Sequence, residues 1–316
     1  MSVNPIVQAT ALRKRYATRE ALAGVSLEVN AGEVVGLLGP NGAGKTTTLS
    51  LLSGIIRADA GHVTICGQDL DHAPRLARQK LGLVPQSLAL YPTLTAMENL
   101  EFFGRIQGLT GHDARERALA LLSQVGLLDR MNEPVSDYSG GMKRRLNLAC
   151  GMIHQPTALL LDEPAVGVDP QSRGRIFTVI EDVAKKGAAV LYSTHYMDEV
   201  ERLCSRVILI DHGRIAAKGS IPELIERAGA ELRLEVKTRD RLNAGWASGV
   251  NGVRELPGGL EDGVGAALAL TAVDRVPDVI RCAELAGGQV VEFHLHRPNL
   301  QDAFLALTGH GLRDSV

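Results

Sequence analysis

The chain has 316 residues, of which 45% are hydrophobic and 22% charged, a globular composition that excludes disorder over most of its length. Its 34 Lys and Arg nearly balance 36 Asp and Glu, and only 3% of residues are aromatic. The balanced charge disfavours a protein whose main function is to bind nucleic-acid phosphates. The scarcity of aromatic residues disfavours a surface that stacks on bases. Because the length exceeds that of a usual single domain, we expect two domains.

The sequence predicts neither a membrane-spanning helix, a signal peptide, nor a set of disulfide bonds. No apolar run reaches the roughly 18 residues that a membrane-spanning helix needs. Residues 1–18 do not have the pattern of a signal peptide. The four cysteines lie far apart without a CxxC pair, so neither a disulfide framework nor a zinc site is expected. These features indicate a cytosolic protein with reduced thiols.

The first two thirds of the chain alternate short apolar runs with helical stretches. Continuous apolar runs predict strands that are buried on both faces of a parallel sheet, at 33–38, 158–162, 188–193 and 206–211. Segments 21–29 and 61–66 predict a smaller antiparallel region. Between residues 93 and 155 the pattern is helical, with apolar residues at a period near 3.6 within 114–125.

A domain boundary is expected near residues 228–230, where the pattern changes to strict alternation. The predicted order beyond it is strand 231–238, helix 240–248, strand 253–256, strand 266–273, helix 276–286 and strand 289–296. This β-α-β-β-α-β order is ferredoxin-like, and a last helix is predicted over 300–307 with Asn299 as N-cap and Asp302 in its first turn. His294 and His296 share one strand face, but no third ligand is spaced for a metal.

The strongest local signal is a phosphate-binding loop of the form G-x-x-x-x-G-K-[ST]. It comprises Gly39, Pro40, Asn41, Gly42, Ala43, Gly44, Lys45 and Thr46, and it is followed by a helical stretch from Thr47. Glycines let backbone N–H groups surround phosphate oxygens, and the helix N-terminus adds partial positive charge. Lys45 is expected to reach the β- and γ-phosphates of a nucleotide, and the Thr46 hydroxyl to bind Mg²⁺.

Two carboxylates follow a later buried strand. Asp162 and Glu163 come at the carboxyl end of the strand predicted over 158–162, the edge where open α/β sheets bind ligands. Asp162 suits a magnesium partner, and Glu163 suits a general base or a residue that orients water. Phosphate-binding loops serve kinases, GTPases, helicases and transporters, so these elements alone leave the function open.

The segment Tyr138-Ser139-Gly140-Gly141-Met142 decides between those classes. It resembles the signature of the ATP-binding cassette (ABC) family, a Ser-Gly-Gly core that opens a helix. The resemblance implies two cassettes packed head-to-tail, with each nucleotide lying between one phosphate-binding loop and the Ser139, Gly140 and Gly141 of the partner. The implied fold is an α/β cassette over residues 1–228, with a RecA-like core, an antiparallel β subdomain and a helical subdomain at about 92–156. A small accessory domain follows over 229–316.

Further positions match the family in chain order. By resemblance, Gln86 contacts Mg²⁺ and senses the γ-phosphate, and His195 is the switch histidine that holds the γ-phosphate near Glu163. Asp169 matches the loop aspartate at the dimer interface. Tyr16 matches the aromatic residue that stacks on adenine, although Arg13, Lys14 and Arg15 leave its register open.

The signature has Tyr138 and Met142 where the commonest form of the family has Leu and Gln. This variant resembles daunorubicin-resistance-type exporter ATPases, and so does the tail Arg297-Pro298-Asn299-Leu300-Gln301-Asp302-Ala303-Phe304. The resemblance implies an ATP- and Mg²⁺-dependent subunit at the cytoplasmic face of the membrane. It would act as a cassette dimer, expected to be a homodimer, beneath separate permease subunits, with residues 90–92 as a candidate contact surface. The alternatives are an importer ATPase, a non-transport ABC ATPase acting on ribosomes or DNA, and a module in which nucleotide is only structural.

Overall fold

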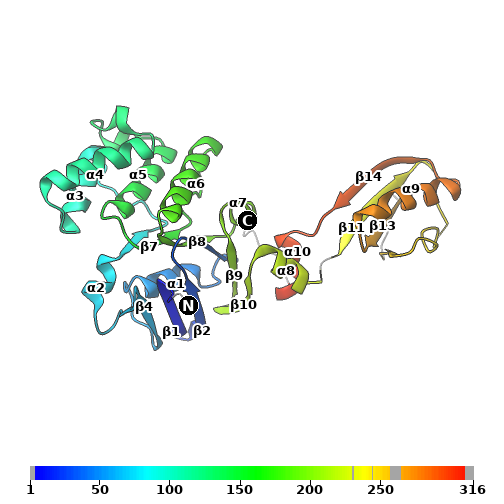
Figure 1. The fold of residues 1–316 in the computed structure, drawn as a ribbon, viewed down its shortest axis with the longest axis horizontal. Helices are drawn as coiled ribbons and strands as arrows, with labels where there is room; N and C mark the ends of the chain where they lie inside the picture. The colour runs from blue at the N-terminus through cyan, green and yellow to red at the C-terminus, as the bar shows by residue number, and fades with distance from the viewer. Residues whose placement is uncertain (1–3, 230, 244, 257–264, 310–316) are drawn as a thin grey trace. The chain divides into compact units, whose positions relative to one another are not determined.

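A computed structural model describes residues 4–229, 231–243, 245–256 and 265–309. The chain divides into two compact units, one that ends at Ile221 and one that begins at Pro222 (Figure 1). Each unit is described by itself. The division falls at the start of α8 (Ile221–Arg227), upstream of the boundary predicted after residue 228.

The first unit is built on a six-stranded sheet with the order β10-β9-β3-β8-β7-β6. Neighbours from β9 to β6 are parallel, and β10 pairs antiparallel with β9. The strands are β3 (Val34–Leu38), β6 (Leu81–Val84), β7 (Ala158–Asp162), β8 (Ala189–Thr194), β9 (Arg206–Asp211) and β10 (Arg214–Gly219). Every residue of β3, β7 and β8 is buried, which explains why these strands are continuous apolar runs in the sequence.

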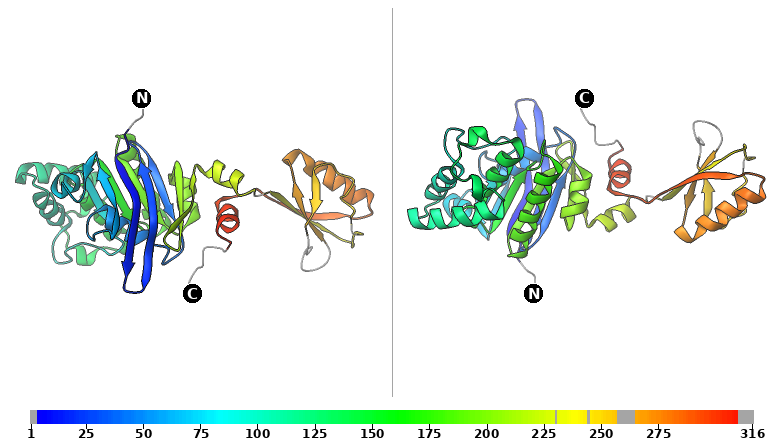
Figure 2. Two further views of the ribbon diagram at one scale, coloured as in Figure 1. Left: turned by 90° about the horizontal axis from the view of Figure 1, so that it is seen from below. Right: turned by 90° about the horizontal axis from the view of Figure 1, so that it is seen from above.

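A second, antiparallel sheet has the order β2-β1-β4-β5. Its members are β1 (Val7–Tyr16), β2 (Arg19–Val29), β4 (Ala60–Ile65) and β5 (Gln68–Asp69), and the long pair β1 and β2 is blue in Figure 2. The inner side chains of this sheet, such as Leu12 and Leu22, share one apolar core with Leu49 and Leu160. The antiparallel region predicted from the sequence is therefore confirmed.

The helices of the first unit fall into two groups. Four pack on the sheets, namely α1 (Lys45–Leu52), α2 (Pro74–Gln79), α6 (Pro170–Lys185) and α7 (Met197–Leu203). The others are α3 (Ala96–Ile106), α4 (Gly111–Gln124) and α5 (Gly140–Met152), of which α5 also contacts β6, with 3₁₀ turns at Leu128–Arg130 and Val135–Asp137. Helices α3, α4 and α5 form a separate group between β6 and β7 in the chain (Figure 1). A capping box fixes the start of α3, where Thr95 and Glu98 exchange hydrogen bonds.

The second unit contains a four-stranded antiparallel sheet with the order β12-β13-β11-β14. Its elements are β11 (Leu232–Thr238), β12 (Val253–Glu255), β13 (Gly265–Leu270), a 3₁₀ turn (Val273–Arg275), α9 (Val276–Leu285), β14 (Val290–His296) and α10 (Leu300–Thr308). Strands β11 and β12 run the same way with β13 between them, as in the predicted split β-α-β arrangement. The N-cap prediction for the last helix is confirmed, because Asn299 and Asp302 form a capping box.

The helix predicted over residues 240–248 is wrong. The described residues of that segment form turns, and Gly245 has a φ of 79°, which breaks a right-handed helix. The Glu255 carboxylate, from the neighbouring strand, accepts the backbone N–H groups of Gly245 and Ala247 at 3.2 and 3.4 Å. Trp246 packs against the small core of the unit instead of following a helical face.

Two further predictions concern membranes and metals. Within the described ranges, no helix has both the length and the apolar character that a bilayer crossing requires. His294 pairs with Glu292 at 3.0 Å on the exposed strand β14, and the described part of the chain holds no cluster of three metal-ligating side chains.

Candidate active site

The phosphate-binding loop connects β3 to α1, and two of its glycines are required by the backbone. Gly44 is the N-cap of α1 and has a φ of 109°, a conformation that side chains with a Cβ rarely adopt. A Cβ on Gly39 would lie 2.2 Å from the carbonyl oxygen of Ile210. The loop therefore holds its shape only with glycine at both positions, and the N-terminus of α1 opens directly from it.

Lys45 is held at the mouth of this loop. Its ammonium donates to the carbonyls of Gly39 at 2.8 Å and Pro40 at 3.2 Å, and it lies 3.4 Å from Oε1 of Glu163. Only 5% of the side chain's surface is exposed. Burial lowers the pKa of the Lys45 ammonium, and the nearby Glu163 carboxylate counteracts part of that effect.

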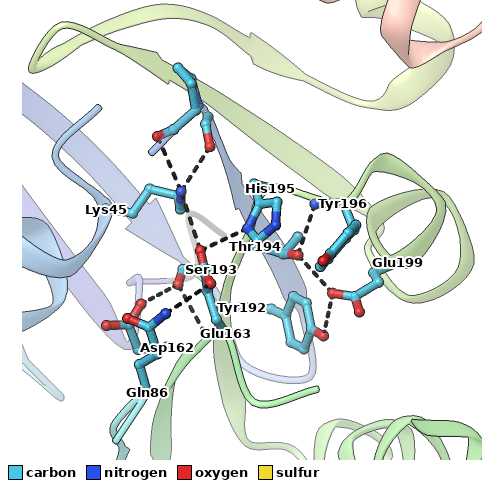
Figure 3. Close-up of polar contacts among 12 residues, drawn as sticks. Lys45, Gln86, Asp162, Glu163, Tyr192, Ser193, Thr194, His195, Tyr196 and Glu199 are labelled. Atoms are coloured by element: carbon cyan, nitrogen blue, oxygen red, sulfur yellow. Dashed lines mark hydrogen bonds and ion pairs between the residues drawn. The ribbon is translucent and has the colours of Figure 1, made fainter. Parts of the chain in front are cut away.

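Glu163 is the centre of the polar cluster in Figure 3. Gln86 donates to its Oε2 at 3.1 Å, and Nδ1 of His195 lies 3.0 Å from its Oε1. The residue has a φ of 46°, a strained backbone value, which its N–H stabilises by donating to the carbonyl of Ser193 at 3.1 Å. The cluster thus brings together Lys45, Gln86, Glu163 and His195, which the sequence had predicted as one site.

Asp162 lies one residue earlier, at the end of β7. It is paired in register with Ser193 on β8, and the Ser193 hydroxyl donates to its Oδ1 at 2.6 Å. The same hydroxyl accepts the backbone N–H of Glu163 at 3.3 Å. Ser193 therefore orients both carboxylate residues, and sequence analysis missed it because its partners depend on strand register.

A cavity of about 450 Å³ opens over the loop. Its lining residues are Tyr16, Arg19, Ala21, Asn41, Gly42, Gly44, Lys45, Thr46, Thr47, Gln86 and Glu163. Tyr16, predicted to stack on adenine, is 47% exposed at the end of β1. Arg19 is a residue that sequence analysis missed, and it donates to the carbonyl of Gly42 at 3.0 Å. Its basic side chain adds positive charge beside a site shaped for phosphate.

Two of the three predicted magnesium ligands line this cavity, and the third is next in sequence to a lining residue, Glu163. Thr46 and Gln86 line it, and Asp162 lies buried beside Glu163. A hydroxyl, an amide oxygen and a carboxylate are the hard oxygen ligands that Mg²⁺ prefers. The backbone of Gln86 is also held in place, because the Arg144 guanidinium of α5 donates a hydrogen bond to its carbonyl. The donor set therefore fits the ion.

The signature residues lie elsewhere in the first unit. Ser139 is the N-cap of α5, and its hydroxyl accepts the N–H of Met142 at 3.3 Å. Asp169 is the N-cap of α6 and accepts the N–H of Ser172 at 2.9 Å, which holds the pKa of this carboxyl below its usual value. A Cβ on Gly141 would lie 2.4 Å from the Ser172 hydroxyl and 2.8 Å from an Asp169 oxygen. Neither Ser139, Gly140, Gly141 nor Asp169 is among the lining residues of the cavity.

Comparison with known proteins assigns the family. The family model for ABC transporters matches residues 22–166. Over 312 residues, 98% of this chain and all of the relative, the chain is 37% identical to the linearmycin resistance ATP-binding protein LnrL of Bacillus subtilis (strain 168). The chain belongs to the ATP-binding proteins of ABC transporters.

Other ABC ATP-binding proteins match at similar levels. The daunorubicin resistance ATP-binding protein DrrA2 of Streptomyces coeruleorubidus is 41% identical over 308 residues, 96% of this chain and 95% of its own. Nod factor export ATP-binding protein I of Burkholderia pseudomallei is 40% identical over 324 residues, covering 99% of this chain and all of its own. The matched names agree with the predicted resemblance to exporter ATPases.

Solved structures confirm the cassette fold. An ATP-binding subunit of an ABC transporter superposes with a TM-score of 0.66 at 29% identity, covering 71% of this chain and 93% of its own. A dimeric cassette in a post-hydrolysis state bound to ADP and Pi gives a TM-score of 0.63 at 27% identity, with coverage of 68% and 98%. The ABC cassette described here is therefore an ATP-binding ATPase, as its family and its phosphate-binding loop both require.

Proposed function

We propose that this ABC ATPase drives an exporter, and that it does so as a dimer of cassettes acting on separate membrane subunits. The observation that carries the proposal is the Glu163 carboxylate, held by Gln86 and His195 beside Lys45 at the rim of the cavity. The named relatives act in resistance to linearmycin and daunorubicin and in Nod factor export, which favours export over import. From the same relatives we infer a drug, an antibiotic or a similar hydrophobic cargo.

Hydrolysis requires a water molecule to attack the γ-phosphate of ATP. Glu163 is the group placed to accept a proton from that water, since it lines the cavity and a carboxylate can serve as a general base. His195 orients Glu163 through their 3.0 Å contact. Lys45 supplies a positive charge that stabilises the developing charge on the phosphate oxygens.

Three side chains of this site offer oxygen ligands for magnesium. Thr46, Gln86 and Asp162 would hold the ion, which would neutralise phosphate charge. Ser193 fixes the Asp162 carboxylate by the 2.6 Å hydrogen bond. The ligand assignment rests on this donor chemistry and on the position of the three side chains.

Dimerisation would complete the site. The cavity is lined by the phosphate-binding loop but not by the signature, which supports a contribution to the γ-phosphate site from a second chain. We propose that Ser139, Gly140 and Gly141 of a partner cassette make this contribution, with Asp169 at the interface. A second copy of this chain offers both halves and is the simplest partner. The solved cassette bound to ADP and Pi is a dimer, which supports dimerisation of this chain.

The membrane subunits need a docking surface. Tyr91, within the predicted contact segment 90–92, is 46% exposed and packs edge-on against Phe102 at 4.8 Å between ring centroids. Phe102 and Ile106 of α3 are also exposed, at 37% and 63%. This apolar surface is suited to a permease loop, which would hold the chain at the cytoplasmic face of the membrane.

Substitution of the proposed base tests the function. In Glu163→Gln the amide keeps the size of the side chain but cannot take up a proton, so we expect the ATPase kcat to fall at least about 100-fold. ATP binding should persist, and ATP should trap the chain as a dimer visible by size-exclusion chromatography. Wild-type turnover in this variant would remove Glu163 from the mechanism, while an inactive variant that stays monomeric with ATP would contradict the dimer.

A further inference from the structure

A second polar cluster lies behind His195 and is centred on Glu199 of α7. Its carboxylate is almost fully buried, with 1% of the residue exposed. The hydroxyls of Tyr192 and Thr194, both on β8, donate to the same oxygen, Oε2, at 2.9 and 2.7 Å (Figure 3). Burial raises the pKa of the Glu199 carboxyl, and the two hydroxyl hydrogen bonds oppose that shift.

Thr194 connects this carboxylate to the turn that carries His195. Its hydroxyl oxygen accepts the backbone N–H of Tyr196 at 3.0 Å while its proton goes to Glu199. Strand β8 ends at Thr194 and α7 begins at Met197, so His195 lies in the short link between them. Both neighbours of His195 are therefore tied, one directly and one through Thr194, to a single buried oxygen.

Arg173 approaches the other oxygen of Glu199 from α6. Its Nε lies 3.8 Å from Oε1, and among the described residues neither atom has a hydrogen-bond partner. The guanidinium also lies 5.9 Å from the ring centroid of Tyr196 and 3.6 Å from the Asp198 carboxylate. Arg173 is one helical turn after Asp169, to whose carbonyl its N–H donates at 2.9 Å. A buried carboxylate needs such a countercharge, because desolvation of an unpaired charge is costly.

We propose that Glu199 is a positioning residue, which through Thr194 fixes the turn at residues 194–196 and so aims His195 at Glu163. Arg173 supplies the countercharge and joins this turn to the helix that Asp169 starts. The inference rests on the proposed role of His195 in hydrolysis. Neither Glu199 nor Thr194 lines the nucleotide cavity, so the effect should fall on turnover rather than on ATP affinity.

Two isosteric variants separate positioning from general packing. Thr194→Val and Tyr192→Phe each remove one hydroxyl from Oε2 of Glu199, but only Thr194 also holds Tyr196. We expect Thr194→Val to lower kcat about tenfold with KM for ATP within about twofold of wild type, and Tyr192→Phe to leave kcat within about twofold. Thr194→Ser, which keeps the hydroxyl, should recover kcat to within about threefold of wild type.

Glu199→Ala tests the carboxylate itself. It should lower kcat at least as much as Thr194→Val, and the double variant should lose no more than the larger single loss, because both changes free the same turn. Thermal melting of each variant shows whether the chain remains folded. If Glu199→Ala does not fold, the comparison of Thr194→Val with Tyr192→Phe still tests the positioning role. A merely structural cluster would lower the melting temperature of Thr194→Val and Tyr192→Phe alike without changing kcat per folded molecule.

His195→Ala distinguishes a failure of this inference from a failure of the proposed function. If His195→Ala is inactive while Thr194→Val turns over at the wild-type rate, Glu199 does not position the histidine. The same conclusion holds if Tyr192→Phe loses as much kcat as Thr194→Val. If His195→Ala itself is fully active, the role assigned to His195 is wrong, and the positioning role falls with it.

Discussion

The two units of this chain bury their strands in different ways. In the first unit β3, β7 and β8 are buried on both faces, and their carboxyl ends present the loop of Lys45 and the side chains of Asp162 and His195. In the second unit β11 alternates between buried Leu234 and Val236 and the more accessible charged residues beside them. A sheet covered on both sides leaves its strand ends as the place for polar groups. The alternating sheet has a polar face instead, and none of the predicted ATP-site residues belongs to it.

The largest effect should come from the ammonium at the centre of the first unit. Lys45→Ala removes the positive charge that lies 3.4 Å from Glu163, so we expect ATPase activity to fall at least about 100-fold. Steady-state phosphate release measures the loss. The melting temperature of the second unit should not change in this variant. A decrease in that melting temperature would show that the stability of the second unit depends on the first.

Truncation of a core side chain should destabilise the unit that contains it. Leu234→Ala and Leu160→Ala each remove a fully buried side chain, and each should lower the free energy of unfolding by about 2–5 kcal/mol. For Leu234→Ala the loss should appear in hydrogen exchange of β11 and β13, with ATP affinity unchanged. Leu160→Ala, two residues before Asp162, should weaken ATP hydrolysis as well. Loss of ATP binding in Leu234→Ala would break the distinction between the units.

The smallest effect should come from two equivalent helix caps. Thr95 in the first unit and Asn299 in the second each form a capping box, with Glu98 and Asp302 respectively. Thr95→Ala and Asn299→Ala should each cost about 1 kcal/mol, seen by hydrogen exchange in α3 or α10 only. Equal exchange in both helices for either variant would contradict independent units.

The sequence predicted most where local pattern decides structure. The strands β3 and β7 and the cap at Asn299 follow from apolar runs and capping chemistry, whereas the grouping of Lys45 and Glu163 with Gln86 and His195 was predicted from the family resemblance. The contact of the signature with a partner's nucleotide and the place of Asp169 at the dimer interface stay predictions.

What the sequence missed depends on contacts between distant segments. Ser193 became visible only through the register of β7 against β8, which places it opposite Asp162. The predicted helix at 240–248 failed because Glu255, from another strand, accepts the N–H groups that a helix would use. Arg19 and Glu199 have no motif at all, and only their positions beside the cavity and behind His195 reveal them.

The close fit at Gly141 also has a mechanical meaning. With no room for a Cβ between this residue and the Ser172 and Asp169 side chains, the first turns of α5 and α6 are in direct contact. The helical group cannot swing relative to the parallel sheet without either moving the start of α6 or separating these two turns. A displacement that keeps the two turns in contact would therefore move the N-caps of both helices, Ser139 and Asp169, together.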